Sequence, residues 1–367
     1  MNIDRRDLLK GTAVAGIAVA LPGRAGAEAV FAPKPGQWRS FETVTKVEIA
    51  RKGGAAQAWI PTPSVNEAAW FVSGETSVEG NAKLAEAKRE AKYGAALVHA
   101  EWAAADEAGI VSVTSRFTTQ DRDVDLKAAG NAAELSAADR ALYTSATSLI
   151  PVDGIVKETS ERIVKGAAGD LDKARAIYEW IVDNTFRNPA TRGCGVGDVA
   201  TLLKSANMGG KCADLNALFV GLARAAGLPA RDVYGLRVAP SRFGYRSLGA
   251  GSANVTKAQH CRAEVFIAGI GWVPVDPADV RKVVLEEPPG NLAVDDAKVV
   301  AARKALLGGW EGNWLAYNFA HDVVLPGATG PAVDFLMYPH AETVAGRLDC
   351  LDPDAFKYTI TARELTS

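Results

Sequence analysis

Cysteine and histidine are scarce in this sequence, with four residues of each kind among 367. Four cysteines are too few for a disulfide scaffold in a chain of this length. No CxxC pair or HxxxH spacing occurs, and the four histidines are scattered along the chain. A zinc site is therefore not predicted, and neither is any other metal or cofactor.

An excess of charge of one sign is also absent. The chain has 41 basic and 43 acidic residues, which gives a net charge of -2. Such a balance provides no overall field that would attract nucleic acid or an anionic membrane surface, so nucleic acid is not an expected partner. With 48% hydrophobic residues, the chain is long enough to bury two or three cores of ordinary domain size.

The only long apolar run lies at the start of the chain. The twin arginines Arg5 and Arg6 precede a small, apolar stretch that stops at Pro22, and Ala25-Gly26-Ala27 follows it. A membrane-spanning helix needs about 20 apolar residues, so this run is better explained as a twin-arginine export signal over residues 1–27, cleaved after Ala27. We expect a periplasmic mature protein without a transmembrane segment. The alternative is a cytoplasmic amino terminus that happens to contain two arginines.

After the signal, short alternating apolar runs separated by Gly and Pro predict an antiparallel β domain over residues 28–130. Its strands are expected at 43–49, 58–60, 95–102 and 110–118. The stretch from Lys83 to Lys92 carries charges of both signs and is interpreted as a solvated loop or a short helix.

From about residue 135 the hydrophobic period becomes helical, and we expect a second domain, the core, over residues 135–290. Amphipathic helices are predicted at 153–165 and 170–186, with Asp170 as the N-cap of the second and Trp180 packed in the core. An α/β extension packed on this core is expected over residues 291–367. It would contain a helix at 298–307 and β segments at 314–325, 333–338 and 355–361.

A cysteine begins one of the core helices. The apolar spacing after Gly209-Gly210-Lys211-Cys212 is helical and ends before Gly227-Leu-Pro229. The helix dipole and Lys211 both favour the thiolate of Cys212, and the two glycines would let a substrate backbone approach closely. With Cys212 free, at most one disulfide could form, among Cys194, Cys261 and Cys350. The alternative for Cys212 is a small buried residue.

A β-hairpin follows, from His260 to Ile267 and from Gly271 to Asp276. If residues 268–270 form a three-residue loop, His260 faces Ala278 and Asp276 is its diagonal neighbour on the same face. A loop of two or four residues would place them on opposite faces. With a thiol nearby, this pair supplies a nucleophile, a base and an orienting carboxylate. Taken singly, His260 could be a hydrogen-bonded strand residue and Asp276 a turn residue. Trp272 either shapes a cleft or packs in the core.

The sequence resembles the bacterial transglutaminase-like superfamily over about residues 170–280. The resemblance rests on four segments: Gly210 to Asp214, Leu222 to Arg231, His260 to Glu264, and Gly271 to Pro277. It implies a papain-like α+β fold, in which the helix bearing the cysteine packs on an antiparallel β-sheet. By position it assigns the nucleophile to Cys212, the base and acid to His260, and the orienting carboxylate to Asp276.

This sequence departs from the family pattern at Cys261-Arg262, where many members have a small residue and a tryptophan. Because this position is expected beside the site, the departure bears on substrate preference more than on the triad. The expected function is thiol-dependent hydrolysis or acyl transfer at an amide bond, with a peptide or protein as substrate, cell-wall peptides included. The protein would then be a protease, an amidase or an acyltransferase. A non-catalytic module that binds peptide or glycan in the cell envelope is the alternative, and acetyl transfer from CoA is disfavoured by export.

Overall fold

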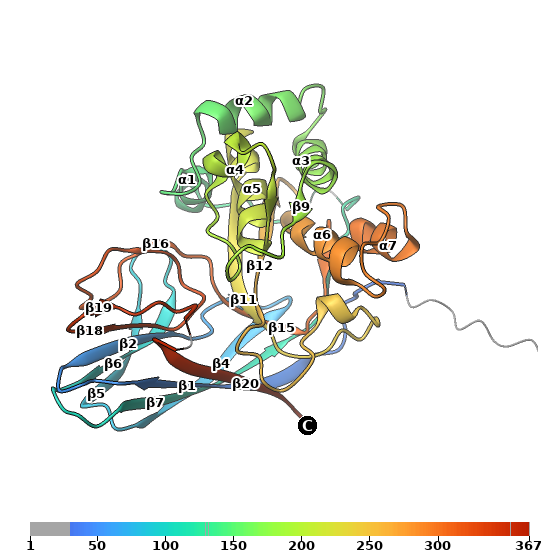
Figure 1. Ribbon diagram of the computed structural model, residues 1–367. Coiled ribbons are helices and arrows are strands. Elements are labelled where there is room, and N and C mark those ends of the chain that lie inside the picture. The colour runs from blue at the N-terminus through green and yellow to red at the C-terminus, as the bar shows by residue number, and fades with distance from the viewer. Residues whose placement is uncertain (1–29, 129, 131, 353, 367) are drawn as a thin grey trace, which may run out of the picture.

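The computed structural model describes residues 30–128, 130, 132–352 and 354–366. The predicted signal, residues 1–27, lies outside the described residues. A β-sandwich lies at the bottom left of Figure 1, and a helical layer and a small sheet lie above it. Within the described part of the chain, no helix is both long and apolar enough to cross a membrane.

Two five-stranded antiparallel sheets form the sandwich, in the orders β20-β1-β7-β4-β3 and β19-β18-β2-β6-β5. The strands from the amino-terminal part of the chain are β1 (Arg39–Ile49), β2 (Ala56–Pro61), β3 (Asn66–Glu67), β4 (Phe71–Gly80), β5 (Leu84–Arg89), β6 (Ala96–Trp102) and β7 (Gly109–Thr119). All four predicted strands are confirmed. The prediction for Lys83 to Lys92 is wrong, because β5 occupies it as an edge strand that pairs only with β6. An exposed edge tolerates alternating charges, since it has no apolar face to bury.

Strands from the end of the chain complete both sheets. They are β18 (His340–Thr343), β19 (Gly346–Arg347) and β20 (Lys357–Leu365). The last strand, β20, pairs with β1 from Ser40 opposite Leu365 to Glu48 opposite Lys357. The end of the chain therefore belongs to the sandwich that the first strands begin. The division into the predicted domains remains a prediction.

The helical layer covers one face of a four-stranded antiparallel sheet of order β13-β12-β11-β15 (Figure 1). Its helices are α1 (Ala137–Thr144), α2 (Gly154–Ile163), α3 (Asp170–Asn184), α4 (Val199–Lys204) and α5 (Cys212–Ala225), and the strands are β11 (Ala230–Arg237), β12 (Gln259–Ile267), β13 (Gly271–Val275) and β15 (Trp314–Asn318). The predicted helices are confirmed, but the N-cap of α3 is Gly169. Asp170 is instead in the first turn, where its carboxylate interacts favourably with the positive end of the helix dipole and lies 3.2 Å from Lys173 Nζ.

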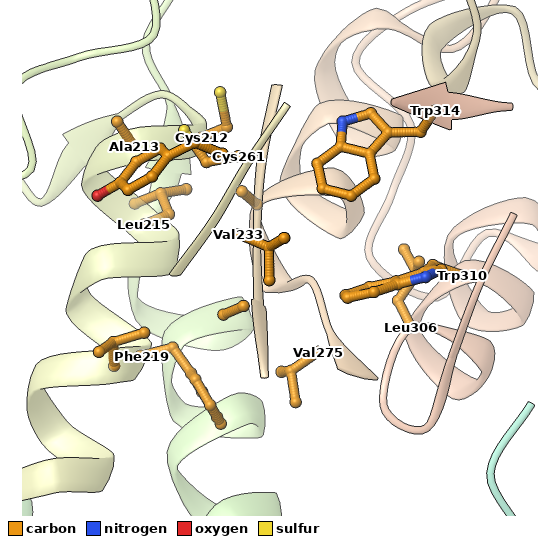
Figure 2. Close-up of a cluster of buried hydrophobic side chains, with 14 of the residues drawn as sticks. Cys212, Ala213, Leu215, Phe219, Val233, Cys261, Val275, Leu306, Trp310 and Trp314 are labelled. Carbon is orange, nitrogen blue, oxygen red and sulfur yellow. The ribbon is translucent and has the colours of Figure 1, made fainter. Parts of the chain in front are cut away.

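Helix α5 is the centre of the hydrophobic core. Leu215 and Phe219 face Val233 and Val275 of the sheet, and Trp310 and Trp314 pack on the opposite face (Figure 2). Trp180 packs against the same cluster, as predicted. The remaining elements are β8 (Arg122–Asp123), β9 (Phe186–Arg187), β10 (Gly209–Gly210), the 3-10 turn η1 (Arg246–Leu248), α6 (Pro277–Glu286), α7 (Ala297–Ala305), β14 (Gly309–Trp310), β16 (His321–Val323) and β17 (Val333–Phe335). They confirm the helix predicted at 298–307 and the β segments predicted beyond it.

Candidate active site

Cys212 is the first residue of α5, as the sequence predicts, and it is 4% exposed. The Asp214 carboxylate accepts hydrogen bonds from the backbone N–H groups of Lys211, Val196 and Gly197 at 2.9 to 3.0 Å. The Ala213 N–H donates to the Cys194 carbonyl at 2.9 Å. These bonds fix the glycine-rich loop around Cys194 against the start of the helix, so the cysteine has a defined position.

The two glycines before Cys212 have a packing role that differs from the predicted one. A Cβ on Gly209 would lie 2.2 Å from the Phe186 ring, and one on Gly210 would lie 2.5 Å from the Asp214 Cβ. These positions are therefore occupied by the protein's own side chains, and glycine is needed there because any side chain would collide with them. The expected close approach of a substrate backbone does not explain them.

The hairpin has the predicted three-residue loop, with Ile267 opposite Gly271 and Ala263 opposite Val275. Beyond Val275 the strand ends, because Asp276 is the N-cap of α6 and its side chain accepts from the Asp279 N–H at 3.0 Å. The prediction that His260 faces Ala278 across the hairpin is therefore wrong, since Ala278 lies in α6. The Asp-Pro pair favours this helix start, because Asp is a good N-cap and Pro is tolerated at the first helical position.

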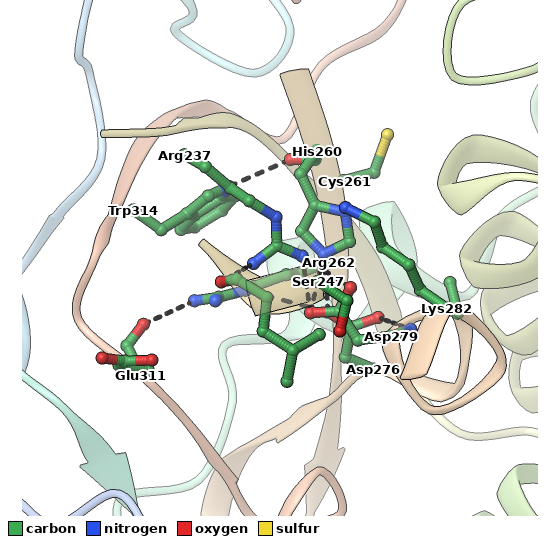
Figure 3. A network of polar contacts seen from close by, with 12 residues as sticks. Arg237, Ser247, His260, Cys261, Arg262, Asp276, Asp279, Lys282, Glu311 and Trp314 are labelled. Atoms are coloured by element: carbon green, nitrogen blue, oxygen red, sulfur yellow. Dashed lines mark hydrogen bonds and ion pairs between the residues drawn. The ribbon is translucent and has the colours of Figure 1, made fainter. Parts of the chain in front are cut away.

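His260 and Asp276 nevertheless meet at the open end of the hairpin. The Nε2 atom of His260 lies 2.7 Å from Asp276 Oδ2 and 3.4 Å from Asp279 Oδ2, and all three side chains are buried (Figure 3). Asp279 in turn accepts two bonds from Arg237 Nη2, at 2.5 and 2.7 Å. The Nδ1 atom of His260 takes no part in these contacts and remains available to the thiol.

Electrostatics keep the imidazole of His260 charged. Burial and the positive charge of Arg237 lower the pKa of His260, but the Asp279 and Asp276 carboxylates outweigh them and raise it to about 9. Burial and the neighbouring Asp279 raise the pKa of Asp276, whereas Arg237 and His260 hold the pKa of Asp279 well below its usual range against the cost of burial. Asp279 is thus the more firmly ionised carboxylate of the two.

The thiol of Cys212 lies among two other thiols. The neighbouring Cys194 and Cys261 thiols lower the pKa of Cys212 well below its usual range, and His260 lowers it further, although burial raises it. The Cys194 thiol itself donates to Gln259 O at 3.3 Å, and the Cys261 thiol to Met337 Sδ at 3.8 Å. All four cysteines are free, so the structure holds no disulfide among them.

Cys212 and His260 line the same cavity, which has a volume of about 590 Å³. Asp276 lies behind His260 and does not line it. One wall comes from the end of the chain, with Tyr338, Leu351, Phe356 and Tyr358. The hydroxyl of Tyr338 accepts from the Cys194 N–H at 3.0 Å. The C-terminal segment therefore helps to shape the site. The cavity is not lined by Trp272, which packs against Tyr143 and Phe266.

Comparison with known proteins agrees with this geometry. Residues 157–277 match the model of the transglutaminase-like superfamily, and residues 2–22 match the signal sequence of the twin-arginine translocation pathway. A Haemophilus influenzae protein described as uncharacterized is 37% identical over 334 residues, which cover 86% of this chain and 89% of that protein. The chain belongs to the transglutaminase-like superfamily. Its export signal makes it an exported protein.

One solved structure supports the fold of this transglutaminase-like protein. A crystal structure from Cytophaga hutchinsonii, titled a "putative cysteine protease", is 15% identical and covers 89% of this chain and 99% of its own, with a TM-score of 0.50. The periplasmic domain of TgpA from Pseudomonas aeruginosa is also 15% identical and covers 67% of this chain and 88% of its own, with a TM-score of 0.33. The first of these shows a shared fold.

Arg262 stands where the sequence departs from the superfamily pattern. It is 2% exposed and does not line the cavity, so it lies behind the site and not on its surface. Its guanidinium lies over the rings of Trp310 and Trp314, at 5.1 and 4.6 Å, and its Nε is 3.8 Å from Asp276 Oδ2. Arg262 therefore acts on the electrostatics of Asp276, because it places a positive charge behind that carboxylate.

Sequence reasoning missed two residues that hold the Asp276 carboxylate and its neighbour in this transglutaminase-like site. Asn216 donates to Asp276 Oδ1 at 3.2 Å and to the Cys261 carbonyl at 2.8 Å. It lies one helical turn after Cys212 on an otherwise apolar face, which is a detectable signal. Arg237, the partner of Asp279, lies at the end of a continuous buried strand and has no comparable local pattern.

His260, Asp276 and Asp279 are also close enough to be considered as metal ligands, since one atom from each lies within 4.8 Å of the others. The short bond between His260 and Asp276 and the two bonds from Arg237 to Asp279 already occupy these atoms. A positively charged arginine at the same carboxylate opposes a cation. The donor set thus fits an acid–base pair better than a metal centre.

Proposed function

We propose that Cys212, His260 and Asp276 form a catalytic triad for thiol-dependent hydrolysis or acyl transfer at amide bonds. The observation that carries the proposal is that Cys212 and His260 line one cavity while a buried carboxylate holds the imidazole from behind. His260 bonds Asp276 through Nε2 at 2.7 Å, and its presence helps to lower the pKa of Cys212. A buried carboxylate that fixes the imidazole, and an imidazole that pairs with a thiol at a helix start, are the elements of an activated nucleophile.

In the reaction, the Cys212 thiolate attacks the carbonyl carbon of an amide and forms a C–S bond. The C–N bond then breaks, and the leaving nitrogen takes a proton from the His260 imidazolium. Water attacks the resulting thioester and passes a proton to His260. The C–S bond breaks, and the thiolate and imidazolium are restored. If an amine replaces water, the same steps give acyl transfer.

The oxyanion formed in each step needs hydrogen-bond donors near the sulfur. The Ala213 N–H is already used, because it donates to the Cys194 carbonyl at 2.9 Å. The N–H of Leu215 donates to the Lys211 carbonyl at 3.0 Å. We therefore assign the Cys212 N–H as the first donor of the oxyanion hole.

The substrate class follows from the export signal and the cavity. An exported thiol enzyme of a twin-arginine pathway acts in the periplasm, where peptides and proteins offer amide bonds. A cavity of about 590 Å³ admits several residues of a peptide. We infer a periplasmic protease or amidase that acts on peptide or protein substrates, cell-wall peptides among them.

Alkylation of the mature protein by iodoacetamide, mapped by mass spectrometry, tests the triad without a known substrate. The pKa of Cys350 is raised by burial and by Asp349 to about 11, which makes this residue a built-in control. We expect Cys212 to be labelled at about pH 6, more than about a hundredfold faster than Cys350, because only Cys212 is a thiolate there. His260→Ala should reduce this preference, because His260 is one of the groups that lower the pKa of Cys212.

Equal labelling of Cys212 and Cys350 would contradict the triad. The alternative, a non-catalytic module that binds peptide or glycan, would be favoured if a Cys212→Ala variant restored the wild-type phenotype to a deletion strain. Cys350→Ala is the matched variant and is expected to restore the wild-type phenotype in either case.

A further inference from the structure

The cavity around Cys212 is lined by positive charge. Besides the catalytic pair, six of its lining residues are cationic and none is acidic. The cationic residues are Arg187, Arg192, Lys211, Arg237, Lys257 and Lys282. The chain as a whole carries a net charge of -2, so this concentration of positive charge is local and does not reflect composition. A concave site lined by charge of one sign attracts ligands of the opposite sign.

Carboxylates outside the lining compensate only part of this charge. The three arginines each pair with one of them: Arg187 with Glu286, Arg192 with Asp349 and Arg237 with Asp279. Glu286 also serves Lys282, at 3.7 Å from its Nζ. Three carboxylates thus face six cations. Asp279 is also shared with His260, which leaves the excess positive.

Two of the lysines have no acidic partner in the part of the chain that the structure describes. Among the described residues, Lys211 and Lys257 form no ion pair within 4.0 Å, although 25 such pairs occur elsewhere in the structure. Lys211 directly precedes Cys212, and Lys257 precedes His260 by three residues. Both positions therefore lie next to the proposed reacting groups.

Lys282 carries the third unbalanced charge. It lies on α6, one turn after Asp279, and its side chain is 17% exposed (Figure 3). Burial lowers its pKa, and the positive charges of Arg237 and Arg187 act in the same direction against the Asp279 and Glu286 carboxylates. The Lys282 amine is therefore stabilised by an incoming anion, because its partner Glu286 lies 3.7 Å away, beyond hydrogen-bond distance.

We propose that the cavity selects an acyl donor that carries a carboxylate close to the scissile amide, such as an acidic peptide, and that Lys211, Lys257 and Lys282 bind this carboxylate. The inference rests on the proposed function, because it takes Cys212 as the reacting atom. Lysine suits this task, since its compact charge and flexible chain follow a carboxylate whose position varies among peptides.

Two alkylating reagents that differ in charge test the proposal. Iodoacetate carries a carboxylate next to its reacting carbon, and iodoacetamide is its neutral counterpart. The rate ratio of iodoacetate to iodoacetamide at Cys212 reports the positive potential at the sulfur, whereas the thiolate fraction cancels. Lys257→Gln and Lys282→Gln should each lower this ratio by about two- to fivefold, as expected for the loss of one partly solvated charge contact. Lys211→Gln should do the same.

Lys46→Gln is the matched control, because Lys46 is exposed on β1 and does not line the cavity. It should leave the ratio unchanged. Added salt should lower the ratio in the wild type, since screening weakens an exposed charge contact.

The imidazolium of His260 also attracts iodoacetate, so a high rate ratio in the wild type does not by itself show that the lysines bind an anion. The change in the ratio when a lysine is replaced tests this. If all three lysine variants keep the wild-type ratio, the proposal is wrong while the triad stands. If Cys212 reacts with neither reagent faster than Cys350, the proposed function itself fails. A second measurement uses Cys212→Ala and fluorescent peptides. An acidic peptide should bind more tightly than its amidated, uncharged form, and equal affinity would contradict the proposal.

Discussion

Nε2 of His260 lies 2.7 Å from Oδ2 of Asp276, although the two residues come from different kinds of element. His260 lies on β12, and Asp276 is the N-cap of α6. The carboxylate therefore has two tasks: Oδ2 orients the imidazole, and Oδ1 accepts from the Asp279 N–H at 3.0 Å and from Asn216 at 3.2 Å. Its effects on catalysis and on stability can be separated by substitution.

Asp276→Asn should lower the turnover of an amide substrate by about 10³- to 10⁴-fold, because the amide cannot stabilise the imidazolium or fix its tautomer. Stability should change little, because asparagine is as good an N-cap as aspartate. Asp276→Ala should lose activity to a similar extent and also cost about 1 kcal/mol of helix capping. Thermal unfolding and kinetics of the two variants check this. An Asn variant with nearly full activity would exclude an orienting role for Asp276.

Turnover of an amide substrate should depend on pH through His260. The pKa of His260 is raised above its ordinary value to about 9, so the imidazolium is present below that pH and is lost as the pH rises through it. Catalysis that needs both thiolate and imidazolium should therefore decline above about pH 9 and stay high down to the lowered pKa of Cys212. A pH profile of kcat/KM measures the alkaline limit. Asp279→Asn should shift this limit downward, since Asp279 is the stronger of the two charges that raise the pKa; an unchanged limit would contradict the assignment.

Glu264 should contribute to stability rather than to chemistry. It is fully buried on β12, forms an ion pair with Arg122 and lies 2.6 Å from Arg231 Nε. Glu264→Gln should lower the free energy of unfolding by about 3 kcal/mol, because it leaves two buried arginines without their shared charge. Urea unfolding monitored by tryptophan fluorescence measures the change.

Glu86→Gln is the matched control for Glu264. Glu86 lies on the edge strand β5, 2.7 Å from Lys88, and both side chains are partly exposed. Its replacement should change the free energy of unfolding by less than about 0.5 kcal/mol. Equal effects of the two replacements would show that the buried cluster has no special role.

His340 should make the protein less stable in acid. Burial and Arg347 lower its pKa to about 4, whereas the unfolded chain has the ordinary value of 6.5. The folded state therefore binds fewer protons than the unfolded state between these two values, and stability falls as the pH drops from about 6.5 to about 4, by up to about 3 kcal/mol. His340→Gln should remove this part of the pH dependence. If the urea midpoints of the wild type and of His340→Gln fall equally as the pH is lowered from about 6.5 to about 4, the prediction is wrong.

The residues that could be predicted from sequence were those with a local pattern. The position of Cys212 at a helix start and the three-residue loop of the hairpin follow from spacing over a few residues, and both are confirmed. β5 was missed, because an edge strand with alternating charges has no apolar period to detect. The pairing of β20 with β1 joins segments more than 300 residues apart, which no local signal reports.

The residues of the candidate site were also predictable only where a local sequence pattern reports them. Arg237 and Cys194 lie far along the chain from Asp279 and Cys212, and tertiary packing alone brings them together. The charge of the cavity is likewise a sum over separate loops, so the near-neutral composition conceals it.

Acylation of Cys212 by p-nitrophenyl acetate tests the central claim most directly, since this ester acylates activated thiols without specific recognition. The account predicts a burst of one equivalent of p-nitrophenol and a single acetyl group on Cys212 after acid quenching. The burst should be absent in Cys212→Ala and slowed by about 10²-fold or more in His260→Ala. Cys350→Ala should behave as the wild type. Acetylation that is no faster at Cys212 than at Cys350, or a rate that His260→Ala leaves unchanged, would contradict the account.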